Sequence, residues 1–316
     1  MDLNGRARRR VEAILARAND LRVDLHPIEG GGRWVDFGID AQGGLGAGLE
    51  LARVCLADLA EVTLVPGTVD GKPCPLVQVV TDHPVAACLA SQYAGWQVAE
   101  GKFFAMGSGP MRAAAGKEAI FDAIGHRDGS PGAVVGILEG RKPPTRAVVA
   151  KIASACRVEP DGVTFLVAPT ASLAGTLQVV ARSVETALHK LHELGFDLAR
   201  VVSAFGVAPL PPVAKGDLAA IGRTNDAILY GARVVIDIDG EDDDSIADLG
   251  PRVPSSASPE HGEPFAAIFA RHGGDFYAID PHLFSPAEVV FRNIETGRSH
   301  AFGSTEDAIL ARSFLS

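Results

Sequence analysis

The sequence is poor in cysteine, in aromatic residues and in long apolar runs. It has 4 cysteines in 316 residues, and only 6% of its residues are aromatic. The cysteines show neither CxxC spacing nor the density of a disulfide scaffold, so we expect buried or reduced thiols. No run reaches the roughly 18 consecutive apolar residues of a transmembrane helix, which argues against a membrane protein.

An excess of positive charge is also lacking. The formal net charge is −10, which argues against a protein that neutralises many phosphates along a nucleic acid. Residues 1–10 are polar and are followed by no apolar signal-peptide core, so we expect a cytoplasmic protein. Hydrophobic residues make up 47% and charged residues 22%, as in ordinary globular proteins.

Hydrophobic patterning predicts a mixed α/β (α+β) protein. Strands and helices are interleaved without a strict β-α-β rhythm, so the pattern does not predict a purely parallel sheet. The expected strands are 34–39, 61–65, 76–81, 96–99, 133–138, 163–167, 228–238, 287–294 and 299–302, and the expected helices are 7–20, 47–59, 84–93, 110–115, 171–194 and 264–271.

The length of the chain predicts two lobes. We expect each lobe to have a mixed sheet flanked by helices, and we expect a substrate cleft between the two lobes. The clearest linker lies at 209–212, where three of the four residues are prolines that cannot continue a helix or a central strand. We therefore predict an N-terminal lobe over 1–208 and a C-terminal lobe over 213–316. An N-terminal segment packed with the C-terminal lobe is the alternative.

Two glycine-rich segments could expose backbone amides to an anionic or acceptor-rich ligand. Residues 43–48 follow an expected strand, but they lack the third glycine of a dinucleotide fingerprint. Residues 107–110, Gly-Ser-Gly-Pro, lack the lysine of a phosphate-binding P-loop. A structural turn is the competing interpretation for both segments, and an NAD(P)-dependent oxidoreductase using 43–48 is an alternative function.

Charged residues on the helix expected at 171–194 also allow two interpretations. Arg182 and Glu185 lie three residues apart and mostly opposite the apolar stripe, and by spacing alone this favours an exposed ion pair over a functional pair. His189 and His192 have no second cluster that would complete a metal site. The acidic residues of 237–244 lack the spacing of a calcium loop, so we expect a solvated loop and no metal.

Several segments together resemble the methenyltetrahydromethanopterin cyclohydrolase family, and they are spread over most of the chain. The segments are Thr81-Asp82-His83-Pro84, Ala94-Gly95-Trp96, Phe104-Ala105-Met106-Gly107-Ser108-Gly109-Pro110, Val167-Ala168-Pro169-Thr170-Ala171-Ser172, Arg182-x-Val184-Glu185-Thr186, Thr224-Asn225-Asp226, Asp275-Phe276-Tyr277-x-Ile279-Asp280 and Leu283-Phe284-x-Pro286-Ala287. As a series they are far more specific than any single segment.

The resemblance implies hydrolysis of the methenyl bridge between N5 and N10 of a pterin one-carbon carrier, giving the 5-formyl compound without metal or redox cofactor. It implies that Arg182 and Glu185 are the catalytic pair and that the protein is a homo-oligomer, such as a trimer. A non-catalytic pterin-binding protein of the same fold is a further alternative. The residues that match substrate-binding positions are Ser91, Tyr93, Gly107, Ser108, Gly109, Glu139, Thr170 and Ser172.

One residue departs from the family pattern. Tyr93 follows Ser91-Gln92 where archaeal members have lysine, so a role for that lysine does not transfer to this chain. The substitution is consistent with a related carrier, such as a dephosphorylated analogue. In either case, Glu185 is expected to act as base and then acid, with Arg182 as its charge partner.

Overall fold

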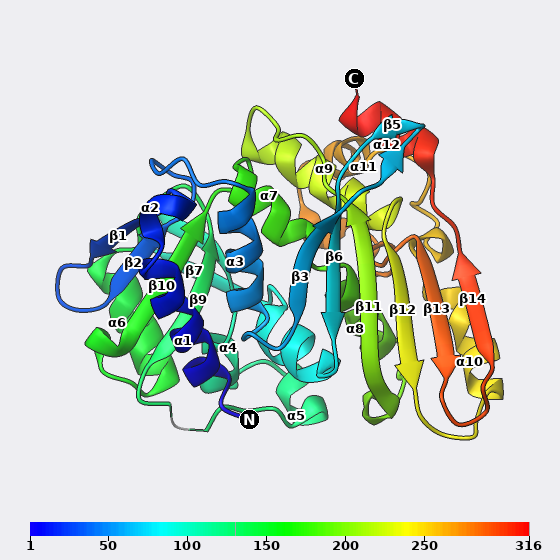
Figure 1. The fold of residues 1–316 in the computed structure, drawn as a ribbon, viewed down its shortest axis with the longest axis horizontal. Coiled ribbons are helices and arrows are strands. Elements are labelled where there is room, and N and C mark those ends of the chain that lie inside the picture. The colour runs from blue at the N-terminus through cyan, green and yellow to red at the C-terminus, as the bar shows by residue number, and fades with distance from the viewer. Residues whose placement is uncertain (130, 316) are drawn as a thin grey trace. The chain divides into compact units, whose positions relative to one another are not determined.

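The computed structural model describes residues 1–129 and 131–315. By their internal contacts these residues form two compact units (Figure 1). Unit 1 comprises Met1–Ala60 and Ala86–Gln178, and unit 2 comprises Glu61–Val85 and Val179–Ser316. Each unit has a six-stranded sheet that mixes parallel and antiparallel pairs, which confirms the predicted mixed α/β class.

The sheet of unit 1 has the strand order β1-β2-β10-β9-β8-β7. Strands β2, β10 and β9 are parallel, and the remaining pairs are antiparallel. The elements are α1 (Leu3–Leu15), α2 (Ala18–Leu21), β1 (Asp24–Pro27), β2 (Arg33–Asp36), α3 (Leu45–Cys55), the π-helix η1 (Val85–Gln92), β7 (Trp96–Glu100), β8 (Phe103–Ser108), α4 (Met111–Ala115), α5 (Ile120–Ile124), β9 (Val134–Glu139), α6 (Arg146–Cys156), η2 (Pro160–Gly162), β10 (Val163–Ala168) and α7 (Leu173–Val180).

Helices cover both faces of this sheet, so its central strands are apolar on both sides. Every residue of β10 is buried, and its side chains alternate between two cores. Phe165 packs in the core that includes α6, whereas Leu166 packs in the core that includes α1 and α3 (Figure 1). The short apolar runs that predicted β9 and β10 therefore belong to central strands.

The sheet of unit 2 has the strand order β14-β13-β12-β11-β6-β3 and one parallel pair, β12 with β13. The elements are β3 (Glu61–Val65), β4 (Thr68–Val69), β5 (Lys72–Pro73), β6 (Leu76–Thr81), α8 (Ser183–Glu193), η3 (Leu198–Arg200), β11 (Val201–Pro209), α9 (Asp217–Leu229), β12 (Arg233–Ile238), α10 (Asp244–Leu249), η4 (Gly250–Arg252), η5 (Ser255–Ala257), α11 (Phe265–Arg271), η6 (Phe276–Ala278), η7 (Pro281–Leu283), β13 (Glu288–Asn293), β14 (Ser299–Gly303) and α12 (Asp307–Phe314).

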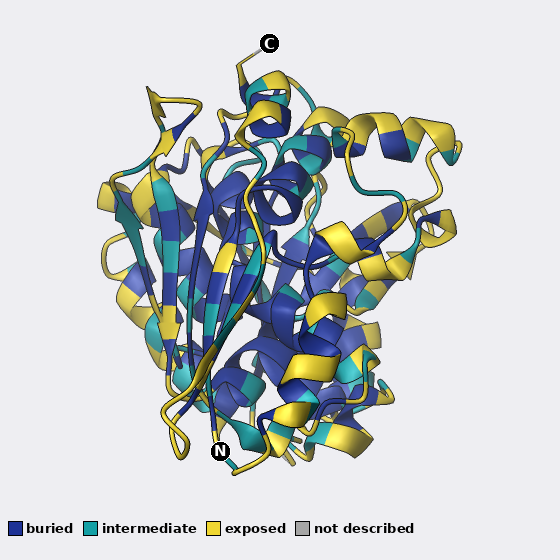
Figure 2. Ribbon diagram, turned by 90° about the vertical axis from the view of Figure 1, so that its right-hand side faces the viewer, coloured by how far each residue is buried: buried dark blue, intermediate teal, exposed yellow. Residues whose placement is uncertain are grey.

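Helices α8 and α9 pack on this sheet, and both contact the central strand β11. Buried positions alternate with more exposed ones along β6, β12 and β13, as expected for strands with one covered face. Figure 2 shows this alternation as dark blue bands between teal and yellow ones. Within the described ranges 1–129 and 131–315, no helix is long and apolar enough to cross a membrane.

The structure differs from the sequence prediction in two places, the helix expected at 171–194 and the lobe boundary expected at 209–212. That helix is two helices, α7 and α8, which are separated at Ala181 and Arg182. Arg182 has φ −91° and ψ 10°, outside the helical range, although no glycine or proline marks a break. Pro209 is the last residue of β11 and pairs with Leu76, so the proline cluster does not separate the two units.

A buried carboxyl group joins three helices of unit 2. Asp226 of α9 is 1% exposed, and its side chain accepts hydrogen bonds from the backbone N–H of Phe265 (2.7 Å) and the hydroxyl of Ser313 (2.6 Å). These partners belong to α11 and α12. Burial raises the pKa of the Asp226 carboxyl to about 6, against the opposing effect of these hydrogen bonds.

We predict that Asp226→Asn raises the free energy of unfolding, relative to wild type, more at neutral pH than at acid pH. Because the folded-state pKa is raised from 3.8 to about 6, the native protein binds more protons between these pH values. The Asp226 contribution therefore lowers the free energy of unfolding as pH rises through this window, by up to about 3 kcal/mol. Without the charge, the asparagine amide oxygen can still accept from the Phe265 N–H, and its NH₂ group can donate to the Ser313 hydroxyl oxygen.

Urea unfolding at pH 4.5 and pH 7.5 checks this prediction. The stability difference between variant and wild type should move in favour of the variant at the higher pH. Asp217→Asn in the first turn of the same helix is the control. A stability difference that is the same at both pH values would contradict the prediction.

Candidate functional site

Arg182 and Glu185 form a buried pair at the start of α8. Arg182 is the residue before the first helical position, and Glu185 lies in the first turn. Their side chains are 8% and 5% exposed, and an Arg182 guanidinium nitrogen lies 4.0 Å from a Glu185 carboxylate oxygen. The exposed ion pair that spacing alone favoured is therefore wrong. A carboxylate in the first turn is also favoured by the positive end of the helix dipole.

A glycine in the central strand allows α8 to begin at this place. A Cβ atom on Gly206 of β11 would lie 2.5 Å from the hydroxyl of Ser183 and 2.8 Å from a methyl of Val184. The first turn of α8 thus lies directly against the strand. The Thr186 hydroxyl donates to the carbonyl oxygens of Arg182 (3.1 Å) and Ser183 (3.0 Å), which strengthens the same turn.

A buried lysine anchors the next turn of α8. Lys190 is 2% exposed, and its ammonium group donates to the carbonyl oxygen of His282 at 2.7 Å. Burial lowers the pKa of Lys190 to about 8, against the attraction of the Asp280 carboxylate. Lys190 thereby connects α8 to η7, in the part of the chain that carries the last family-like segments.

In unit 1, the structure brings Ser91, Ser108 and Gly109 together around Cys55. The Ser91 hydroxyl donates to the carbonyl oxygen of Cys55 at 2.6 Å, and the Ser91 carbonyl oxygen accepts from the N–H of Gly109 at 2.8 Å. The Ser108 hydroxyl lies 3.4 Å from the Cys55 sulfur. Like the other three cysteines, Cys55 is a thiol outside any disulfide, and it is buried. It thus connects α3, η1 and β8.

The glycine-rich segment at 107–110 is a strand end and a turn rather than an open loop. Gly107 and Ser108 are the last residues of β8, where they pair with Leu138 and Ile137 of β9. Gly109 has φ +88°, a conformation that favours glycine, and a Cβ there would lie 2.5 Å from Ile137. The sequence analysis predicted no strand at 103–108, so it missed β8 and the fact that this strand ends in Gly107 and Ser108.

Glu139 is the last residue of β9, and Thr170 and Ser172 follow the parallel strand β10, so the three lie at the same edge of the sheet. The Glu139 carboxylate lies 3.5 Å from the side-chain amide nitrogen of Gln178. The Ser172 hydroxyl donates to the Pro169 carbonyl (2.8 Å) and accepts from Gly175 (3.0 Å), so it holds the turn before α7. The carbonyl oxygen of Thr170 accepts from the Thr176 hydroxyl at 2.8 Å.

Tyr93 follows η1 and is partly buried. Its ring lies over the guanidinium group of Arg112, with 4.9 Å from the Arg112 Cζ atom to the ring centroid. All eight predicted substrate-binding residues belong to unit 1, whereas Arg182 and Glu185 belong to unit 2.

The glycines of 43–48 come after a turn organised by a buried aspartate, and Gly46 and Gly48 already belong to α3. Asp36, 1% exposed, accepts hydrogen bonds from the backbone N–H groups of four residues. These donors are Gly38, Ile39, Asp40 and Ala41. Gly43 has φ +59°, and a Cβ there would lie 2.4 Å from the carbonyl oxygen of Phe37. The local geometry thus explains why a glycine is needed at position 43, where the chain forms a structural turn.

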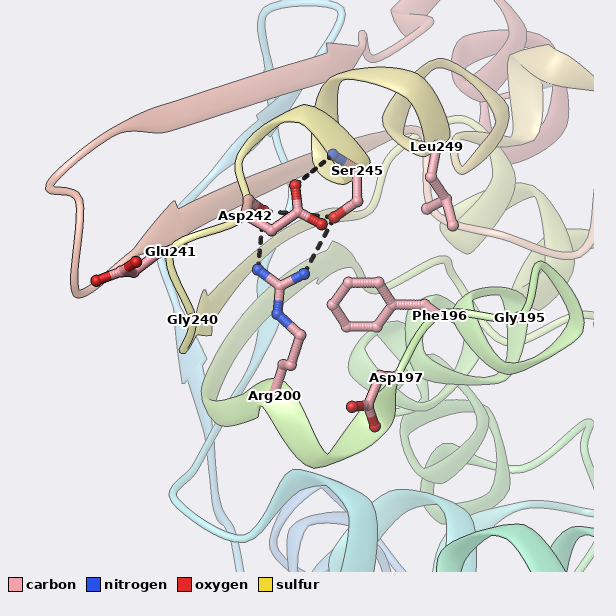
Figure 3. Close-up of a pocket in the computed structure, with 9 residues that line it drawn as sticks. All are labelled: Gly195, Phe196, Asp197, Arg200, Gly240, Glu241, Asp242, Ser245 and Leu249. Atoms are coloured by element: carbon pink, nitrogen blue, oxygen red, sulfur yellow. Dashed lines mark hydrogen bonds between the residues drawn. The ribbon is translucent and has the colours of Figure 1, made fainter.

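A hollow of ≈ 390 Å³ in unit 2 contains none of the predicted site residues. Figure 3 shows Arg200 in it, donating to the Asp242 carbonyl oxygen (2.9 Å) and the Ser245 hydroxyl (3.1 Å). Arg200 also donates to the Asp239 carbonyl oxygen at 2.7 Å, so it braces the acidic loop. Among residues 1–129 and 131–315 no group of three or more His, Cys, Asp or Glu could hold a metal ion.

Sequence reasoning missed several polar residues that hold these groups in place. Arg112 is the one charged side chain of α4 and Gln178 the one amide side chain of α7, and this contrast with their apolar neighbours was the signal that could have identified them. Lys190 could not be recognised from the sequence because lysine is usually a surface residue of a helix. Cys55 carries no sequence motif, and only the fold shows its contacts.

We predict that Gly206→Ala destabilises unit 2 by about 1–3 kcal/mol, because the added methyl group must displace the first turn of α8. Gly216→Ala is the matched control, since a Cβ on Gly216 meets no atom within 4 Å. This control should cost less than about 1 kcal/mol. Urea unfolding of both variants measures the difference, and equal stabilities would contradict the close packing at Gly206.

Comparison with known proteins connects these groups to one family. The family model described as "Cyclohydrolase (MCH)" matches residues 2–314. A methenyltetrahydromethanopterin cyclohydrolase of Methylobacterium sp. (strain 4-46) is 48% identical over 309 residues, covering 96% of this chain and 94% of the relative. The protein of the same name from Rhodopirellula baltica is 49% identical, covering 90% of this chain and 86% of the relative.

An archaeal relative with that name, from Methanococcoides burtonii, is 38% identical and covers 96% of this chain and 95% of its own length. The match to the family model, over residues 2–314, therefore extends through both units. The chain belongs to the methenyltetrahydromethanopterin cyclohydrolase family and is an enzyme of that kind.

Proposed function

We propose that this enzyme hydrolyses 5,10-methenyltetrahydromethanopterin, or its dephospho analogue, to the 5-formyl derivative. The observation that carries this proposal is the buried Arg182–Glu185 pair at the start of α8, in a chain whose relatives bear this enzyme name. The reaction adds one water molecule and leaves the one-carbon unit at the same oxidation level. It therefore requires no redox cofactor, and the proposed proton transfers require no metal.

Glu185 is proposed to move the protons. The substrate is an amidinium cation whose methenyl carbon is electrophilic. Water attacks this carbon while the Glu185 carboxylate takes one of its protons, which gives a neutral tetrahedral adduct. The bond from carbon to N10 then breaks, Glu185 returns the proton to N10, and the remaining hydroxyl becomes the formyl oxygen as its proton goes to solvent.

Arg182 is proposed to orient Glu185 and to keep it ionised. Its guanidinium nitrogen is 4.0 Å from the carboxylate, within the range in which an opposite charge favours the ionised form. Both side chains are nearly inaccessible to water, so this attraction is weakly screened. Arginine suits the position because its side chain remains cationic at every working pH.

The substrate-binding residues are proposed to be those of unit 1. Ser91, Gly107, Ser108 and Gly109 contribute hydroxyl and backbone groups at the end of β8. Glu139 at the end of β9, and Thr170 and Ser172 after β10, contribute further oxygen atoms. A pterin ring system has several hydrogen-bond donors and acceptors, which is the chemistry that such groups recognise.

We predict that Glu185→Gln lowers kcat by about 10²–10⁴-fold while largely preserving substrate binding, since the amide keeps the shape but cannot accept the proton. The loss of methenyl absorbance measures turnover. Glu193→Gln, an exposed change on the same helix, is the control and should retain wild-type turnover. Near wild-type activity of Glu185→Gln would rule out the proton-transfer role.

Arg182→Ala in the same assay is expected to reduce kcat by more than about tenfold, because it leaves the buried carboxylate without its charge partner. Arg182→Lys should retain more activity than Arg182→Ala, since it preserves the charge. Equal activity of the two variants would contradict the charge-partner role.

Substrate binding without turnover by the wild-type protein would favour the alternative of a non-catalytic pterin-binding protein.

The choice of carrier is a separate part of the proposal, and it rests on Tyr93. A neutral aromatic ring cannot form the ion pair that a lysine offers to a tail phosphate. We therefore predict similar or better kcat/KM with the dephospho carrier than with the phosphorylated one. A preference of more than about tenfold for the phosphorylated carrier, equivalent to 1.4 kcal/mol, would contradict this prediction.

The proposal extends to the setting of the enzyme. We propose a cytoplasmic location, and we propose a homo-oligomer, such as a trimer, because the family resemblance implies one. No nucleic-acid or membrane partner is proposed, in keeping with the net charge of −10.

A further inference from the structure

Arg112 is a fully buried arginine whose side chain is not used by the mechanism proposed above. It lies on α4 and is 0% exposed. Arginine is almost never buried to this extent unless its charge and its donors are paired. Its partners therefore indicate what the residue holds in place.

One partner of Arg112 is a carboxylate. Its Nε atom donates to both Glu118 oxygens at 3.0 and 3.1 Å, and a terminal nitrogen donates to Glu118 at 2.5 Å. The Glu118 side chain is 23% exposed. This fork-like pairing fixes the plane of the guanidinium group and compensates for burying its charge.

The other partners of Arg112 belong to the segment that carries Ser91 and Tyr93. The remaining terminal nitrogen donates to the carbonyl oxygens of Leu89 (2.9 Å) and Ser91 (3.3 Å), at the end of the π-helix η1. Carbonyl groups at the end of a helix have no partner within it, and Arg112 binds that of Leu89 and adds a second hydrogen bond to that of Ser91, which also accepts from Gly109. The guanidinium group also lies 4.9 Å from the Tyr93 ring centroid.

Arginine is the only side chain that can make this set of contacts at once. Its flat group has donors on two edges and an aromatic-binding face, and a second ring, Phe121, lies 5.4 Å away. Lysine would keep the charge but lacks the second edge and the flat face. The Ser91 backbone and the Tyr93 ring are thus both placed by one rigid group.

We propose that Arg112 is a positioning residue that places the Ser91 hydroxyl and the Tyr93 ring for binding of the pterin carrier. This inference rests on the proposed function, in which Ser91 and Tyr93 contact the substrate. Arg112 itself acts through these two residues. Glu118 acts indirectly, because it holds the guanidinium group in the orientation that contacts both Ser91 and Tyr93.

Arg112→Lys is expected to raise KM for the methenyl carrier by about tenfold, the effect of losing roughly 1.4 kcal/mol of binding, with kcat changed less than about threefold. A purely structural role would instead lower kcat through a smaller active fraction and leave KM unchanged. Arg127→Lys is the matched control, since Arg127 also binds a carboxylate, Asp122, and a carbonyl oxygen, that of Phe121. It should keep the wild-type KM.

Glu118→Gln keeps the inference testable if Arg112→Lys does not fold. The amide weakens the hold on the guanidinium group but leaves its carbonyl contacts, so we expect a rise in KM of about threefold. A KM within twofold of wild type for every folded variant of Arg112 or Glu118 would overturn the inference.

The wild-type enzyme separates this inference from the proposed function. If the wild type binds the carrier without turnover, the proposed hydrolysis fails, and the Arg112 inference is tested by the dissociation constants of the same variants. If the wild type turns over and the variants keep its KM, the inference fails alone. If the wild type neither binds nor turns over the carrier, both fail.

Discussion

The buried Arg182–Glu185 pair is the constraint around which unit 2 is arranged. Removing two charges from water is costly, and the cost is offset only if the two groups stay close and well oriented. The pair stays in place because the chain breaks between α7 and α8 and because α8 begins against a strand at Gly206. Lys190 then anchors the following turn of α8 to η7.

Much of the fold could be predicted from the sequence where local patterning and tertiary packing agree. The strands β3 and β6 have the predicted bounds, and the hairpin of β13 and β14 lies where its turn residues indicate. The long helix was predicted wrongly because its apolar periodicity continues through Ala181 and Arg182. Its break depends on packing against β11, which no local pattern records. The division into units depends likewise on contacts distant in sequence.

The candidate site was less accessible to sequence reasoning than the fold. Spacing alone favoured an exposed pair for Arg182 and Glu185, and only the resemblance to a family indicated catalysis. The supporting residues were missed because their roles lie in contacts across the fold: Cys55 connects three elements, and Arg112 holds the end of η1. Side chains that act through others have no motif of their own, and only their burial and partners identify them.

The most direct test of the account is a single turnover of the methenyl carrier by the wild-type enzyme in water enriched in ¹⁸O. Mass spectrometry of the product measures the origin of the formyl oxygen. Hydrolysis by the wild-type enzyme predicts one ¹⁸O atom in the 5-formyl group and none elsewhere in the product, and activation of the water by Glu185 predicts that Glu185→Gln forms this labelled product about 10²–10⁴-fold more slowly. A product without the label, or no conversion of the bound substrate, would contradict the account.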